Sequence, residues 1–400
     1  MFGLEPVKFT PEPLMSSRIF SLRLSAFNAF LFLGSGIQLP FLPLWLQDKA
    51  LTEAQIALVV AMMVAIRILA IPVATFLADA TGRRRLIIIV AAFGTCAAYL
   101  LLHFMSGFVP ILIVAMLASA LLAPIAPLTE VMAIEGSAHF GIDYGRIRLW
   151  ASLSFLAGSL IAGALLEVIP VHYVILLIAG AQGLGALVTL VLPHDAVIRE
   201  GTAQPISMAA VLGLVSAGVF VIFLAAASIG QSSHGLLYAF GSVHYDELGY
   251  SKFTIGKLWA IAVIVEILMF AFSNRFYKKF GAVKLIVIGT ACGIIRWLVM
   301  GLEPPLAIMF AVQALHAGSF GLTHLGTMHY IRENVPENMR NTVQGLYSIL
   351  GGGILMAATM WSSGPLYELW GGLSYFVMAL YSAIAFGLAL LLLRVSPKAY

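Results

Sequence analysis

The sequence predicts an all-α membrane protein, and three observations support this fold class. Of its 400 residues, 61% are hydrophobic and only 10% are charged, whereas a soluble protein carries about 25% charged residues. The mean hydropathy is +1.00. A hydropathy window of about 19 residues finds apolar stretches along nearly the whole chain. A polytopic membrane protein therefore fits the composition better than a water-soluble one.

Twelve apolar stretches are each long enough to cross a bilayer as a helix. They cover residues 19–45, 54–77, 86–106, 109–133, 147–168, 171–193, 209–241, 254–274, 283–301, 305–330, 342–363 and 371–394. The seventh is long and can be two pieces or one tilted helix. A hydrophilic break at 194–208 leaves six stretches on each side. We therefore predict an N-terminal tail, a six-helix bundle, a central cytoplasmic loop, a second six-helix bundle and a C-terminal tail, over residues 1–18, 19–193, 194–208, 209–394 and 395–400.

The basic residues predict the orientation of these spans. If the N-terminus is cytoplasmic, seventeen of the 22 Lys and Arg residues face the cytoplasm, and Lys49, Lys252 and Lys257 face outward. This is a strong positive-inside bias, and an even number of spans returns the C-terminus to the cytoplasm. The first residues lack an early apolar region, so no cleavable signal peptide is predicted. We expect a multi-pass plasma-membrane protein, in a bacterium one of the inner membrane.

Several function classes do not fit this pattern. The basic residues lie mostly in short loops, which does not suggest nucleic-acid binding. Cys96 and Cys292 lie within apolar stretches, where small core residues are expected, and no disulfide framework follows. The sequence has no nucleotide motif, metal-ligand spacing or nucleophile elbow. We therefore predict no enzyme, no cofactor and no metal, and the short loops argue against a receptor or scaffold.

Ionisable residues within apolar spans are costly, by roughly 2.5 to 3.5 kcal/mol on insertion scales, so they are usually paired or functional. In the first half, Glu130 and Arg148 lie eighteen residues apart on consecutive spans joined by a short loop. Antiparallel packing can bring them together. Arg146 and Glu135 lie nearer the loop, as a cytoplasmic anchor and a solvated acid. Arg67 lies near the centre of the second span, where it either binds a carboxylate or pairs with an acid.

The second half has its own set of polar groups within the spans. Glu266 and Arg296 lie in mid-span, and His316 and His324 are eight residues apart, hence on similar faces of one helix. Both histidines are candidates to relay a proton or contact substrate. His234 lies in a polar patch that can line a cavity. The central charged residues are three arginines, Arg67, Arg148 and Arg296, and two acids, Glu130 and Glu266. If both acids are ionised, one positive charge remains, which suits a monoanionic substrate. The alternative for each group is a permanent structural ion pair or a satisfied core residue.

A basic loop follows the second span of each half, at 79–85 and at 274–281. The first loop resembles the G-x-x-x-D-R-x-G-R-R motif of the major facilitator superfamily, matching it at Asp79, Gly82, Arg83 and Arg84. Thr75 and Ala80 depart from the motif. The resemblance implies twelve helices in two pseudo-symmetric halves and a role for this loop in gating, beside its role in setting topology.

Within this superfamily the chain resembles the lactose permease group, and more closely the 3-phenylpropionate transporter subfamily. The resemblance runs over nearly the whole length after Arg18, and the segments that carry it are residues 39–45, 143–150, 265–275, 295–297, 315–318 and 329–331. It implies that Glu130 and Arg148 bind substrate and that Arg296 and His316 handle protons. The permease acid three residues after the histidine is Ser319 here. Glu266 is then the best candidate for the proton acceptor.

The predicted function is proton-coupled symport of a small organic anion by alternating access, with an aromatic acid such as 3-phenylpropionate as the first candidate. Its partners would be a small-molecule substrate, protons and the lipid bilayer, with the protein acting as a monomer and the proton gradient as energy source. Two alternatives keep the transporter and change the solute: a proton-coupled sugar or nucleoside symporter, or a multidrug efflux protein.

Overall fold

The computed structural model describes residues 16–193, Gly213 and 217–395, and all regular structure in this part of the chain is helical. Eleven of its helical stretches are long and apolar enough to cross a membrane. The last one, Glu337–Val395, has 59 residues and contains two long helices with a break at Gly371. The protein is thus a multi-pass membrane protein, while the count of twelve crossings stays a prediction. The predicted central loop at 194–208, and most of both predicted tails, lie outside the described residues.

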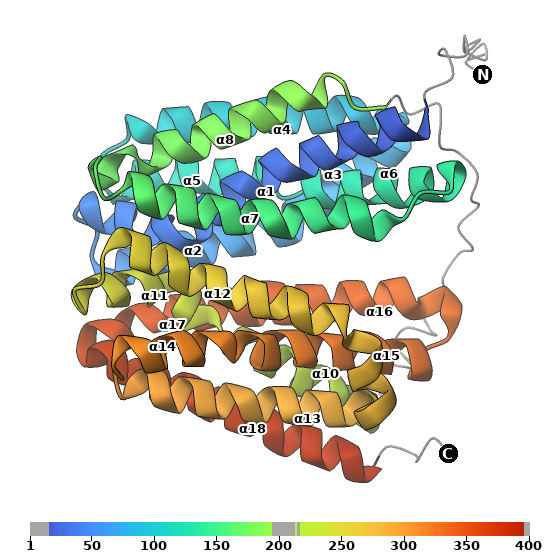
Figure 1. Cartoon of the computed structure of the whole chain (residues 1–400), viewed down its shortest axis with the longest axis vertical. Coiled ribbons are helices and arrows are strands. Elements are labelled where there is room, and N and C mark those ends of the chain that lie inside the picture. Colours follow the sequence, from blue (N-terminus) through green and yellow to red (C-terminus); the bar gives the residue numbers. More distant parts are fainter. Residues whose placement is uncertain (1–15, 194–212, 214–216, 396–400) are drawn as a thin grey trace.

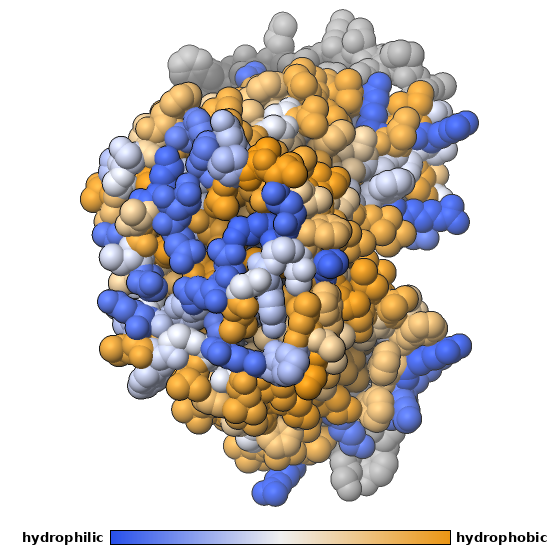
Figure 2. Space-filling view, turned by 60° about the vertical axis from the view of Figure 1, so that its left-hand side comes forward, coloured by the Kyte–Doolittle hydropathy of each residue, from blue (hydrophilic) through white to orange (hydrophobic). Residues whose placement is uncertain are grey.

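The helices form two bundles, one above the other in Figure 1. The upper bundle contains the N-terminal helices, which are α1 (Ser17–Asp48), α2 (Glu53–Ala65), α3 (Arg67–Thr81), α4 (Arg84–His103), α5 (Phe108–Leu122), α6 (Ile125–Phe140), α7 (Tyr144–Leu165), the short η1 (Val171–Tyr173) and α8 (Val174–Thr189). Hydrophobic side chains cover the flanks of the molecule, and hydrophilic ones gather at one end (Figure 2). This distribution is the one that a bilayer around the bundle requires.

The lower bundle contains the C-terminal helices. They are α10 (Gly218–Ser232), α11 (Gly235–Glu247), α12 (Lys252–Ala271), α13 (Ser273–Gly301), α14 (Leu306–Ala314), the π-helical η3 (Ala317–Leu322), α15 (Thr323–Asn334), η4 (Glu337–Met339), α16 (Arg340–Tyr347), the π-helical η5 (Ser348–Ile354), α17 (Leu355–Trp370), η6 (Gly371–Ser374) and α18 (Tyr375–Val395).

Five of the crossings are interrupted near their middle. The breaks lie at Ile66 between α2 and α3, at Ala123 and Pro124 between α5 and α6, at Ser233 and His234 between α10 and α11, and at the π-helical turns η3 and η5. Of the two forms expected for the seventh span, the two-piece form is present, with its break at Ser233 and His234. Irregular backbone at membrane depth is tolerated where it lines a cavity or is buried in protein. The breaks therefore indicate where a cavity lies.

The two bundles meet at one end of the molecule, which we call the closed end. It carries the turns at 49–52, 166–170 and 248–251. There, one hydrophobic core contains side chains of both bundles, among them Trp45, Val59, Trp259 and Met356. At the opposite or open end, each bundle has a core of its own around Phe20 or Phe223. A notch separates the two bundles at the right-hand edge of Figure 2.

Two glycines make the close contact at the closed end possible. A Cβ atom at Gly256 of α12 would lie 2.4 Å from the carbonyl oxygen of Ser159 in α7, and one at Gly364 of α17 would lie 2.7 Å from the Cβ of Ala57 in α2. Both distances are shorter than van der Waals contact. Small residues at helix interfaces let backbones approach closely within membranes. The pairs α7–α12 and α2–α17 thus seal this end on two sides.

Local sequence signals fix several helix ends. Thr52 and Gln55 form a capping box at the start of α2, and the Ser251 side chain accepts the Thr254 amide at the start of α12. Helix α3 ends where Gly82 takes a left-handed conformation with φ 65°, which glycine adopts at little cost. Gly82, the glycine of the predicted motif, therefore terminates helix α3.

Candidate functional site

Two adjoining cavities lie between the bundles, near the helix breaks. The larger has a volume of about 470 Å³ and is lined by Arg67; we call it the Arg67 cavity. The smaller has about 270 Å³, is lined by Glu266 and is called the Glu266 cavity. Their linings share five residues from both bundles: Phe32, Leu39, Phe155, Tyr238 and Phe320. The volume of the Arg67 cavity lies within the range of small-molecule sites, about 300 to 1,000 Å³.

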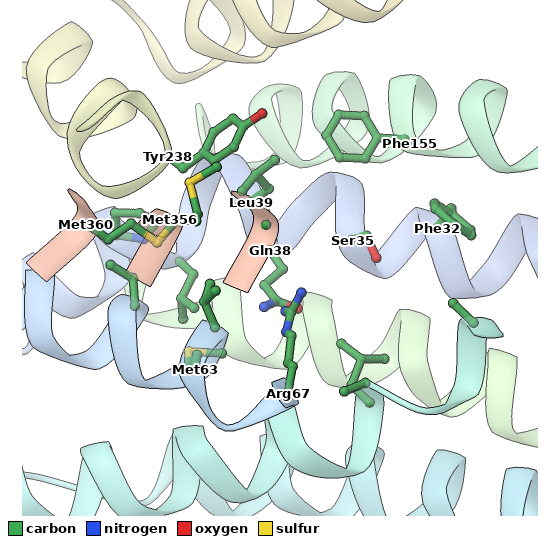
Figure 3. Close-up of a pocket in the computed structure, with 18 of the residues that line it drawn as sticks. Phe32, Ser35, Gln38, Leu39, Met63, Arg67, Phe155, Tyr238, Met356 and Met360 are labelled. Atoms are coloured by element: carbon green, nitrogen blue, oxygen red, sulfur yellow. The ribbon is translucent and has the colours of Figure 1, made fainter. Parts of the chain in front are cut away.

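The Arg67 cavity is mostly apolar. Arg67 extends from the break between α2 and α3 towards Gln38 of α1, and Tyr238, Met356 and Met360 lie across from them (Figure 3). Arg67 Nε donates to Ser119 Oγ at 3.1 Å, and this hydroxyl donates to the Met63 carbonyl at 2.5 Å. None of the described residues that line this cavity is Asp or Glu. The cavity thus joins one oriented cation to an apolar surface.

In the Glu266 cavity, an acid and a histidine from different helices lie in contact. Glu266 of α12 has its Oε2 3.2 Å from His316 Nε2, and His316 Nδ1 lies 3.0 Å from Arg296 Nη1 of α13. A guanidinium can only donate hydrogen bonds, so His316 Nδ1 accepts and its proton is on Nε2, directed at Glu266. His316 therefore lies between Glu266 and Arg296, for which a permanent ion pair was the structural alternative.

Arg296 is fully buried and is the centre of this network. Besides His316, it donates to Ser319 Oγ at 3.2 Å and to Gln313 Oε1 at 2.7 Å. Gln313 in turn donates to the Tyr245 hydroxyl at 2.5 Å. The guanidinium also lies over the Trp297 ring, 4.5 Å from its centroid. Breaking such a network is costly, because each partner is left unsatisfied in a low dielectric.

The other two predicted histidines lie around this network. His234 is fully buried, with Nδ1 3.0 Å from the Gln231 carbonyl and Nε2 3.1 Å from Ser319 Oγ. It is not among the residues that line either cavity, so it lies behind the wall. His324 stacks on Phe320 at 6.1 Å, and His316 stacks on the same ring at 5.0 Å. As predicted, the two lie on similar faces of one crossing.

Glu130 and Arg148 lie near each other without forming a described ion pair. The Tyr144 hydroxyl donates to Glu130 Oε1 at 2.7 Å and also interacts with Arg148. The Arg148 guanidinium lies over the Phe32 ring, 5.0 Å from its centroid, and Arg148 lines the Glu266 cavity. Tyr144 therefore connects the two residues that sequence reasoning paired directly.

The predicted gating motif lies at the open end. Arg84 Nη1 forms an ion pair with Glu135 Oε2 at 3.0 Å, so the predicted solvated acid is in fact paired. Asp79 and Arg83 are exposed at the end of α3, on either side of Gly82. Arg146 is exposed and lies 3.9 Å from Asp143 at the same end, as its predicted role as an anchor requires.

Some residues of the site have little signal in the sequence. Gln313, an amide in an apolar stretch three residues before His316, could have been found by its polarity. Ser119 could not, because a serine in a membrane helix is common and its contact with Arg67 joins residues 52 positions apart. Gln38 lies beside Arg67 in Figure 3, and its position depends on the packing of α1 against the helix break.

Two helical bundles around central cavities that contain a few charged side chains, in a membrane-spanning chain, have the architecture of a secondary transporter. The chain belongs to the MFS_1 like family, whose sequence pattern matches residues 21–389. It is a major facilitator transporter and not an enzyme. The family resemblance derived from the sequence is thereby confirmed.

Known relatives and solved structures agree with this assignment. The chain is 29% identical over 355 residues to the probable 3-phenylpropionic acid transporter of Escherichia coli (strain K12), over 87% of this chain and 92% of that protein. It is 27% identical over 353 residues to the maltose permease of Geobacillus stearothermophilus, over 86% of this chain and 87% of that protein. The nucleoside transporter NupG superposes with a TM-score of 0.78 at 16% identity, over 94% of this chain and 98% of that one. The D-xylose-proton symporter gives 0.71 at 15%, over 96% and 99%. These two structures show the fold alone.

Proposed function

We propose that this transporter carries a small organic anion together with a proton, and that an aromatic acid such as 3-phenylpropionate is its substrate. The relative from Escherichia coli supports the substrate class. The apolar cavity with one arginine supports it as well, because an aromatic acid has an apolar body and one carboxylate. The single observation that carries the proton coupling is the contact between Glu266 and His316 at 3.2 Å.

Glu266 is the group that can gain a proton without disturbing its neighbours. His316 cannot gain a second proton on Nδ1 and still accept from Arg296. A protonated Glu266 keeps one oxygen that accepts from His316. Burial of a charged carboxylate costs free energy, so closing the bundles over Glu266 is easier when it is neutral. A neutral Glu266 also leaves the central arginines less compensated, which favours an anion. Proton and anion thus promote each other's binding.

The proposed orientation has the open end, with both termini, in the cytoplasm. The positive-inside distribution supports it, because Arg83, Arg84 and Arg146 all lie at the open end. The described conformation is then closed to the outside. When the transporter opens to the outside, the cytoplasmic side must close. The motif at Asp79, Gly82, Arg83 and Arg84 would then act as a gate that keeps the cytoplasmic side closed.

Uptake into proteoliposomes tests this function. Labelled 3-phenylpropionate should accumulate when an inward proton gradient is imposed and should not without one. The Glu266→Gln variant should retain exchange of substrate across the membrane and lose gradient-driven accumulation. Glu368→Gln is a matched control, since Glu368 is exposed on α17 and lines neither cavity. Undiminished accumulation by Glu266→Gln would remove Glu266 from the proton pathway, and no gradient-driven uptake of any aromatic acid would refute the substrate class.

A sugar or nucleoside is the second candidate solute, because the maltose permease is also a relative and Glu130 and Arg148 are both present. A sugar needs many hydrogen-bonding groups, since buried hydroxyls without partners are costly. The Arg67 cavity offers few beyond Arg67, Gln38, Ser35 and Gln231. Competition of maltose and of nucleosides against 3-phenylpropionate uptake distinguishes the candidates.

A further inference from the structure

The three central arginines differ in what occupies their donors. Arg296 is fully buried, and three side chains accept its hydrogen bonds. Arg148 lies over Phe32 and shares its cavity with the acid Glu266. Arg67 has one described partner, Ser119, which engages Nε. Its two terminal nitrogens have no hydrogen-bond partner among the described residues, and no described acid lies within ion-pair distance.

An arginine at membrane depth without a paired acid raises the free energy of the folded protein at this position. Arg67 lies at the break of the second crossing, at the depth of the other helix breaks, and faces an apolar cavity. A cation inside the membrane is normally paired or faces a functional cavity. Ser119 restricts its rotation, because it accepts from Nε and is itself held by the Met63 carbonyl. The guanidinium is therefore oriented for a ligand that the protein does not itself supply.

We propose that Arg67 is the residue that binds the substrate carboxylate, in a fork with both terminal nitrogens, and that the apolar body of the substrate lies against Met63, Tyr238, Met356 and Met360. Bidentate guanidinium–carboxylate pairs are short and strongly oriented. Gln38 lies beside the guanidinium in Figure 3 and can donate to the same carboxylate. The inference rests on the proposed transport of an organic anion and adds which arginine selects it.

This placement separates the two transported species. The anion occupies the Arg67 cavity, and the proton occupies the Glu266 cavity, with Phe155, Tyr238 and Phe320 in the wall that both share. The substrate also connects the two bundles, because Arg67 belongs to the N-terminal one while Tyr238, Met356 and Met360 belong to the C-terminal one. A ligand that contacts both bundles can favour a conformation in which they approach each other.

The test compares an acid with its uncharged amide. The purified protein is reconstituted into proteoliposomes, and binding of 3-phenylpropionate and of 3-phenylpropanamide is measured as inhibition of substrate counterflow without a proton gradient. Loss of a charge-assisted bidentate contact should weaken the acid roughly 10- to 100-fold in Arg67→Gln. Binding of the amide should change less than about threefold, which also shows that the variant is folded. Arg67→Lys should retain part of the preference for the acid, because a lysine keeps the charge and loses the fork.

Two further variants identify the arginine. Arg148→Gln should lower the exchange rate and keep the preference for the acid over the amide. Arg146→Gln, two residues away at the exposed end of α7, is the control for a lost positive charge. An unchanged preference in Arg67→Gln, or its loss in Arg148→Gln instead, overturns this assignment while leaving organic-anion transport intact. If the wild-type protein exchanges no monocarboxylate, the proposed function fails together with it.

Discussion

The two halves of the molecule bring polar groups to the shared cavities in opposite ways. In the N-terminal half they stand nearly alone: Arg67 has Ser119, and Glu130 has Tyr144. In the C-terminal half, Glu266, His316, Arg296, Gln313 and Ser319 form one continuous network. Hydrogen-bonded networks fix their members in one arrangement, whereas a group with spare donors is available to a ligand. Under the proposed function, the spare donors of Arg67 would bind the anion, and the network around Glu266 would take part in proton coupling.

At the open end, the two halves are similar in which helices are joined by a side-chain contact. In the first half Arg84 at the start of α4 pairs with Glu135 near the end of α6. In the second half Tyr277 near the start of α13 donates to Glu333 near the end of α15, with Arg332 over the Tyr277 ring. The two contacts join corresponding crossings of each bundle through different chemistry. The internal repeat thus preserves which helices are tied together and varies the groups that tie them.

The largest expected contrast between the halves is in stability. Arg296→Gln should lower the unfolding temperature strongly and abolish uphill transport, because three buried partners lose their donor at about 1 to 3 kcal/mol each. Arg67→Gln should leave the unfolding temperature unchanged or raise it, since it removes a poorly paired cation from the interior. Thermal unfolding of both variants in the same detergent measures the difference. An equal decrease in the unfolding temperature of both variants would show that Arg67 contributes as much to stability as Arg296, which contradicts the proposed difference between the halves.

A smaller effect is expected from the residue that orients Arg67. Ser119→Ala removes the acceptor at Nε and leaves the charge in place. The KM for the acid should rise about 3- to 10-fold, as expected for one partly compensated hydrogen bond to a charged group, with little change in kcat. Thr95→Ala is the matched control, because among the described residues this buried hydroxyl bonds only to the Ala91 carbonyl of its own helix. A purely structural role of Ser119 would instead lower stability without a selective change in KM.

Much of this organisation could be predicted from the sequence. Long apolar stretches define membrane helices whatever their packing, and a charge within one of them is conspicuous. For this reason Glu266, Arg296 and His316 were identified as one group, and the structure places them in contact. The basic loops and the family motif rest on local chemistry as well, and Gly82 has the left-handed backbone conformation that only a glycine takes easily.

The partners within the site could not be predicted, because they depend on helix rotation. The break at Ile66 sets the direction of Arg67, and the π-helical turn at Ala317–Leu322 interrupts the regular helix directly after His316. Regular 3.6-residue periodicity does not extend across such points. The pairing of Glu130 with Arg148 was expected from their separation, the short loop and the family resemblance, and the Tyr144 hydroxyl interacts with both instead. Contacts between bundles join residues too distant in the chain for any spacing rule.

The smallest expected effect concerns the contact that joins the two halves at the closed end. Glu167, which follows α7, accepts the backbone N–H of Phe253 in α12 at 2.7 Å. This hydrogen bond lowers the pKa of the Glu167 carboxyl below its usual 4.5, with further contributions from Ser251 and Lys252, and Lys252 itself pairs with Asp246. A carboxylate with a lowered pKa stabilises the closed end above its usual pKa. That contribution is lost as the pH falls through the lowered value.

Spin labels placed on α7 and α12 at this end measure its opening as a distance distribution. In the wild-type protein the closed population should be constant from pH 7 to pH 5. It should decrease once the pH is lower than about 4.5. Glu167→Gln should lower the closed population about two- to threefold at neutral pH and remove this acidic step, since an exposed contact contributes little. Asp143→Asn, at the open end of the same helix, is the control. An acidic step that persists in Glu167→Gln would assign the pH response to Asp246 or Glu303. The two halves would then be joined at this end by their apolar core and by the close contacts at Gly256 and Gly364, without a contribution from Glu167.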